Sequence, residues 1–64
     1  MRAATVISCE PLSITKLFTV SVEGANGFSF FGVCMVSIPV GSTVHYNEDC
    51  DLFTPDGKLL SYRL

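Results

Sequence analysis

The most restrictive feature of this sequence is the segment at residues 28–37, which is apolar on both faces when it is read as a β-strand. A strand with two apolar faces has to be covered on both sides. In a chain of 64 residues, its own sheet covers one face, so we expect a second subunit to cover the other. Gly32, at the centre, predicts a bulge, a sharp bend or a close backbone approach. The two faces are Phe28, Phe30, Cys34 and Val36, and Phe31, Val33 and Met35.

The length of the chain sets the second constraint. It has 64 residues, of which 48% are hydrophobic and 16% are charged, so it is a single domain and not a disordered segment. For so short a chain, the free energy gained by burying apolar surface and the conformational entropy lost on folding are of similar size. Such chains usually depend on disulfides, a metal or a partner subunit.

The cysteines do not suggest a disulfide framework. Cys9, Cys34 and Cys50 are three in number, so any single bridge leaves one thiol over. The first nine residues hold one basic residue and an apolar run too short for a secretory signal. We therefore expect reduced thiols that act as small buried side chains, and a cytoplasmic location in a bacterium or a host cell.

A membrane span is not predicted either. No Asp, Glu, Lys or Arg lies between Glu23 and Glu48, but the densely apolar part of this stretch, at residues 28–40, is only 13 residues long. A spanning helix needs about 20 apolar residues.

The residue vocabulary is that of β-strands. Val, Ile, Thr and Phe dominate, and Gly or Pro recurs at short intervals. In the second expected strand, Ile14, Phe18, Val20 and Val22 alternate with polar residues and are predicted to point inward. A helix capped by Ser13 is the alternative for this segment, and its β-branched residues argue against it. The six expected strands cover residues 3–9, 14–23, 28–37, 43–47, 51–53 and 58–64.

Turn signals separate these strands. Asn26-Gly27 favours a hairpin at residues 23–27, and Gly41 favours a type II turn after Pro39. The run Thr54–Gly57, with its Pro-Asp-Gly, predicts a type I turn that ends in a glycine bulge. The predicted fold is all-β: a small antiparallel sheet of five or six short strands, curled as a half-open barrel or sandwich and completed by oligomerisation.

No residue constellation predicts chemistry. His45 is the only histidine, and with the nearby acids and Cys50 it forms the one cluster of metal-capable side chains. Its spacing matches neither a structural zinc site nor a calcium loop. His45 with Cys34 or Cys50 supplies the residue types of a nucleophilic site, as almost any sequence with one histidine does. We expect no metal, no cofactor and no catalysis.

Nucleic-acid binding is the runner-up interpretation. Small β-barrels often stack single-stranded bases on exposed aromatics along a basic groove. Phe28, Phe30 and Phe31 are candidates for stacking, but the net charge is −2 and the glycines form no phosphate loop. The four basic residues are scattered: Arg2, Lys16, Lys58 and Arg63.

The remaining functional class is a protein that acts by binding other proteins. We expect a homodimer or larger oligomer that binds another protein, in the style of the accessory and inhibitor proteins of phages and mobile elements. Four of the six acidic residues fall within nine positions and predict a patch that docks on a basic surface. The residues expected in self-association are Phe28, Phe30, Phe31 and Met35. The residues expected to contact the partner are Glu48, Asp49, Asp51 and Asp56.

Overall fold

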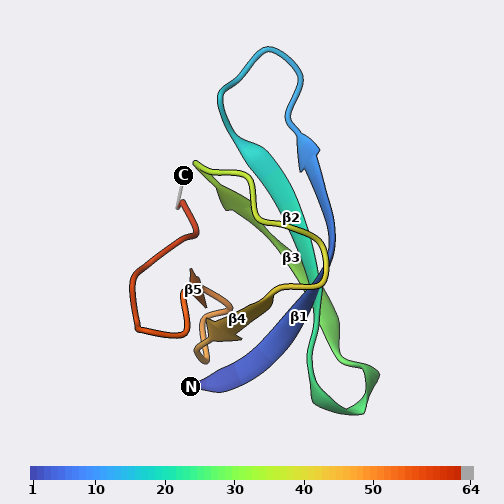
Figure 1. Ribbon diagram of the computed structural model, residues 1–64, viewed down its shortest axis with the longest axis vertical. Coiled ribbons are helices and arrows are strands. Elements are labelled where there is room, and N and C mark those ends of the chain that lie inside the picture. Colours follow the sequence, from blue (N-terminus) through green and yellow to red (C-terminus); the bar gives the residue numbers. More distant parts are fainter. Residues whose placement is uncertain (63–64) are drawn as a thin grey trace.

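The computed structural model describes residues 1–62 and shows one curled sheet of five antiparallel strands (Figure 1). The order of the strands across the sheet is β3-β2-β1-β4-β5. The only helical element in the described part is a single 3₁₀ turn, η1, between β2 and β3. The predicted all-β, antiparallel half-barrel is therefore confirmed. The elements are β1 (Arg2–Pro11), β2 (Phe18–Glu23), η1 (Ala25–Gly27), β3 (Ser29–Cys34), β4 (Thr43–Tyr46) and β5 (Leu52–Phe53).

The segment after β5 bridges the two ends of the sheet. Leu60 N–H donates to Leu52 O of β5 at 2.7 Å, and Tyr62 N–H donates to Val33 O of β3 at 2.6 Å. Ser61 also forms an isolated bridge with Cys34. We call residues 59–62 the seam, because they link the outermost strands. The predicted last strand, at residues 58–64, is thus reduced to isolated bridges, and residues 63 and 64 lie outside the described part.

The core lies on the inner face of the curled sheet. Val20 and Val22 of β2 point inward as predicted, and Phe18 is half-buried against the core. The core is completed from β4 and β5, where Leu52 is fully buried. The buried apolar side chains are Ala4, Val6, Val20, Val22, Cys34, Ile38, Val44, Tyr46 and Leu52.

A β-bulge in β1 breaks the alternation expected from the sequence. Val6 pairs with Val22 but Ser8 pairs with Ser21, so Ile7 is the extra residue. The bulge leaves Ile7 half exposed and turns Cys9 toward the core. A regular strand over the predicted residues 3–9 places Ile7 and Cys9 on the same face. This prediction is wrong, because the inserted residue changes which side chains point inward.

The predicted start of the second strand is also wrong. Residues 12–17 form a turn, in which the Thr15 N–H and hydroxyl both donate to Leu12 O, at 2.9 and 2.7 Å. The strand begins only at Phe18, and Ile14 is 99% exposed instead of inward. The alternative helix over this segment is excluded by the same hydrogen bonds and by the strand.

The edge strand β3 shows the two predicted apolar faces over Ser29–Cys34 only. Phe28 and Val36, which were predicted on the face of Phe30 and Cys34, lie outside the strand and are about half exposed. Phe30 packs against the core and Cys34 is buried, whereas Phe31 and Met35 are 67% and 64% exposed. Gly32 pairs with Val20 without any shift of register, and its hydrogen-only side chain faces Leu52. Of the three predicted roles of Gly32, the close approach is the one observed.

The predicted turns are present. Asn26 and Gly27 have φ of 61° and 74° in the β2–β3 hairpin. In the last turn, Gly57 N–H donates to Thr54 O at 2.9 Å and Gly57 has φ of 96°. The Gly41 turn closes with a hydrogen bond from Ser42 N–H to Pro39 O. Along residues 1–62, no helix has the length and apolar character needed to cross a bilayer.

Candidate functional site

The four predicted partner-binding acids fall on two different turns. Glu48, Asp49 and Asp51 lie in the connection between β4 and β5. Asp56 lies in the turn that follows β5, at the other end of that strand. The structure thus brings three of the four together as one acidic turn, residues 47–51.

Asn47 holds the acidic turn in shape. Its side-chain Oδ1 accepts hydrogen bonds from the backbone N–H groups of Asp49 and Asp51, both at 3.0 Å. Its Nδ2 donates to the Asp51 carboxylate at 3.3 Å. This arrangement is an Asx-type turn, in which a side chain replaces backbone partners. Asn47 is not among the predicted site residues, although an Asn before a polar cluster is a typical turn signal.

Asp56 is fixed in its own turn. The Thr54 hydroxyl donates to the Asp56 carboxylate, and this hydrogen bond lowers the pKa of Asp56, with smaller contributions from its own backbone N–H and from Lys58. Asp56 is therefore an exposed anion at neutral pH.

The four predicted self-association residues do not share one surface. Phe28 lies at one end of the half-barrel, in the hairpin after η1, and Phe30 packs inward. Phe31 is on the outer face of β3, where Ser21 is its cross-strand neighbour. Met35 lies beyond the end of β3, beside the seam.

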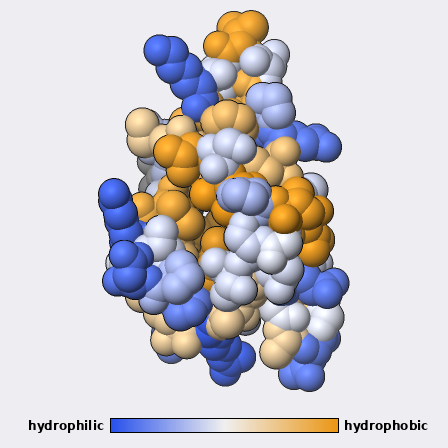
Figure 2. Space-filling model, in the orientation of Figure 1, coloured by the Kyte–Doolittle hydropathy of each residue, from blue (hydrophilic) through white to orange (hydrophobic). Residues whose placement is uncertain are grey.

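Exposed apolar side chains gather beside the seam. Met35, Val36, Leu59 and Tyr62 line one hollow of about 480 Å³, which we call the apolar groove. Their exposed fractions run from 45% for Tyr62 to 64% for Met35. Figure 2 shows that apolar side chains also reach the surface on the face it presents, between polar ones. Of these four side chains, only Met35 is among the predicted contact residues, because the seam brings the groove together from separate segments.

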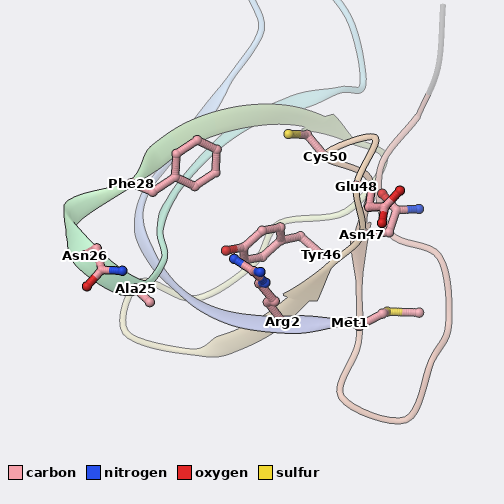
Figure 3. A pocket seen from close by; sticks show the side chains of 9 residues that line it. All are labelled: Met1, Arg2, Ala25, Asn26, Phe28, Tyr46, Asn47, Glu48 and Cys50. Carbon is pink, nitrogen blue, oxygen red and sulfur yellow. The ribbon is translucent and has the colours of Figure 1, made fainter.

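A second hollow, of about 670 Å³, lies at the end of the half-barrel where β1 starts, β4 ends and the β2–β3 hairpin turns (Figure 3). We call it the mouth. Phe28, Phe30 and Tyr46 form an aromatic cluster at it, with ring centroids 5.2 to 6.1 Å apart. The residues that line the mouth are Met1, Arg2, Ala25, Asn26, Phe28, Tyr46, Asn47, Glu48 and Cys50.

The three cysteines lie in different surroundings, and the exposed Cys50 is not the small buried side chain that was predicted. Cys9, Cys34 and Cys50 are free. Burial raises the pKa of the Cys34 thiol, and the nearby Cys9 adds to the shift. Within residues 1–62, no three His, Cys, Asp or Glu side chains come together as a set that could hold a metal ion.

Comparison with known protein families, with characterised proteins and with solved structures finds no match to this chain.

Proposed function

We propose that this chain is a non-enzymatic interaction protein that acts by binding another protein. The apolar groove carries the proposal, because four exposed apolar side chains from two segments meet there. Single exposed apolar residues are ordinary, whereas a gathered set that borders a hollow is typical of an interaction site. Contact with a partner would remove Met35, Val36, Leu59 and Tyr62 from water.

The acidic turn supplies the charge complementarity. Glu48 and Asp49 are exposed on the turn that the Asn47 side chain braces with hydrogen bonds. An acidic patch of this kind speeds encounter with a basic partner surface. We assign the protein to the accessory or inhibitor class, acting in the cytoplasm, where the free thiols stay reduced.

Self-association is a separate part of the proposal and uses the open edge of β3. This strand is outermost in the sheet, and Val33 O already bonds outward, to Tyr62. In an antiparallel ladder, alternate residues point their peptide groups to the same side, so Ser29 and Phe31 present theirs to the open edge. A second copy pairing along this edge would also cover the exposed Phe31 ring. We propose a homodimer built in this way.

The groove is tested by comparing three immobilised proteins against a lysate of the native host cell. The three proteins are the wild type, Leu59→Lys, which places a charge in the groove, and Ile14→Lys. The last is the matched control, because Ile14 is 99% exposed on another loop. A partner retained by the wild type and by Ile14→Lys but lost with Leu59→Lys supports the proposal. Equal retention by all three contradicts it.

The dimer is tested by sedimentation equilibrium at low micromolar concentration. We expect the wild type and Ile14→Lys to be dimeric and Phe31→Lys to be monomeric but folded. A folded, monomeric wild type contradicts the self-association proposal and leaves the groove proposal standing.

Single-stranded nucleic acid is the second candidate partner, favoured by the exposed rings of Phe28 and Phe31. Against it, the described basic residues lie on separate elements: Arg2 on β1, Lys16 before β2 and Lys58 after β5. Fluorescence anisotropy with labelled oligonucleotides at low and moderate salt tests whether the protein binds single-stranded nucleic acid. Salt-sensitive binding in the micromolar range supports this candidate, and flat traces eliminate it.

A further inference from the structure

We propose that the mouth is a binding site for a small molecule that joins a planar ring to an anionic group. This activity goes beyond protein binding and uses a surface other than the apolar groove. Nucleoside monophosphates and aryl carboxylates share the required chemistry.

The first observation is an unpartnered hydroxyl on a buried tyrosine. Tyr46 is only 8% exposed, yet its hydroxyl has no hydrogen-bond partner within residues 1–62. It is not sealed inside the protein, because no fully buried polar side-chain atom in the described part lacks a partner. The hydroxyl therefore opens on the mouth, as Figure 3 shows. Gly24 makes room for it, since a Cβ there would lie 2.8 Å from the hydroxyl oxygen.

The second observation is a cation that lines the same hollow. Arg2 extends from the start of β1 into the mouth and forms no ion pair with any of residues 1–62 (Figure 3). A guanidinium and a phenol are both donors, and together they match a carboxylate or phosphate. The polar donors of the mouth thus select an anion.

The third observation is a supported aromatic surface. The Phe28 ring is about half exposed and lines the mouth. Its other contacts are the rings of Phe30 and Tyr46, at 5.5 and 6.1 Å. These neighbours hold the Phe28 ring in place, and a held ring with an open surface favours stacking by a planar ligand.

The size and the remaining charge of the mouth narrow the ligand. A volume of about 670 Å³ is in the usual range for small-molecule sites. Glu48 lines the mouth away from the Tyr46 hydroxyl in Figure 3. Its carboxylate disfavours ligands with a second acidic group, which points to a single phosphate or carboxylate beside the ring.

The experiment is isothermal titration of the whole chain with AMP, UMP and 3-phenylpropionate at fixed salt. Arg2→Gln should weaken binding by on the order of tenfold, since it removes a charge-assisted donor. Lys16→Gln changes net charge equally on a distant loop and should leave affinity unchanged. Glu48→Gln should tighten binding. Which probe binds distinguishes the phosphate from the carboxylate source.

A conservative variant separates binding from folding. Tyr46→Phe keeps the buried ring and removes only an unpartnered hydroxyl, so its thermal midpoint should match or exceed that of the wild type while affinity falls several-fold. Amide NMR shifts on titration should move at Arg2, Phe28 and Tyr46 but not at Leu59 of the groove. The proposal is overturned if no probe binds at millimolar concentration, if Arg2→Gln binds as the wild type does, or if only oligonucleotides bind.

Discussion

Gly32 of β3 lies against Leu52 of β5 inside the half-barrel, so that a Cβ on Gly32 would meet Leu52 Cδ1 at 3.1 Å. These strands are the two ends of the five-stranded order. Their contact shows how far the sheet curls, because only the Leu52 side chain separates its two edge strands. Leu52 is fully buried, so it has little room to move aside.

Gly32→Ala should lower the free energy of unfolding by about 1–3 kcal/mol, because overpacking forces Leu52 or β3 to shift. Gly32→Val should cost more. Urea denaturation followed by circular dichroism measures both, with Ser29→Ala, an exposed change on the same strand, as the control. An unchanged midpoint for Gly32→Val would show that the two edges do not approach as described.

Gly57→Ala should destabilise for a different reason. A Cβ at Gly57 would meet nothing within 4 Å, but φ is +96°. The expected loss is about 1 kcal/mol or more of the free energy of unfolding, arising from backbone strain alone. Gly57→Asn should lose less, since Asn tolerates positive φ better than Ala. If the two variants unfold at the same midpoint, strain is not the cause.

Asn47→Ala should cost about 1–3 kcal/mol of the free energy of unfolding, because two backbone N–H groups lose their acceptor. Glu48→Ala, at the exposed neighbour, should change it by less than about 0.5 kcal/mol. Amide hydrogen exchange adds a local measurement. Asp49 and Asp51 should exchange faster in Asn47→Ala, and protection equal to wild type would contradict the role given to Asn47.

The buried Cys34 thiol should make the protein less stable in alkali. Its pKa is raised above the ordinary 9.0 in the folded state by burial and by Cys9. Below the unfolded pKa both states hold the proton and nothing changes. Above it the unfolded chain releases the proton while the folded chain retains it, so stability falls as pH rises through this window. Urea midpoints at pH 7 and 10 should differ more for the wild type than for Cys34→Ala.

Alkylation of the native protein gives a companion test. Cys50 is exposed, Cys9 is half-buried and Cys34 is buried. Since the thiolate is the reactive form, iodoacetamide should modify Cys50 first and Cys34 last. Early loss of Cys34 would mean that the core opens readily near the seam.

Much of the sheet follows from local patterns. Val20 and Val22 alternate with polar residues, and the hairpin after them has the Asn-Gly expected of such a turn. The errors arise where tertiary contacts decide. Nothing in the sequence near Ile7 marks it as the extra residue of a bulge, and Ile14 fits an apolar alternation although a turn places it in solvent.

The candidate sites were less predictable than the strands. The acidic turn is contiguous in sequence and can be recognised there, whereas Arg2, Phe28 and Tyr46 come from three elements and meet only after the sheet curls. The groove likewise depends on the seam, in which Tyr62 and Ser61 pair with the distant strand β3. Local periodicity in the sequence carries no information about such tertiary contacts.

The seam has a consequence for how the chain folds during its synthesis. Tyr62 docks on Val33 and Ser61 bridges Cys34, pairings between positions far apart along the chain. Such long-range closures are the slow events of folding. During translation, β1, β2 and β3 can associate early. The core beside Leu52 remains accessible to water until residues 59–62 have left the ribosome and can pair with β3. Every nascent copy therefore passes through an open-sided stage, in which its core is most exposed to mispairing with a neighbour.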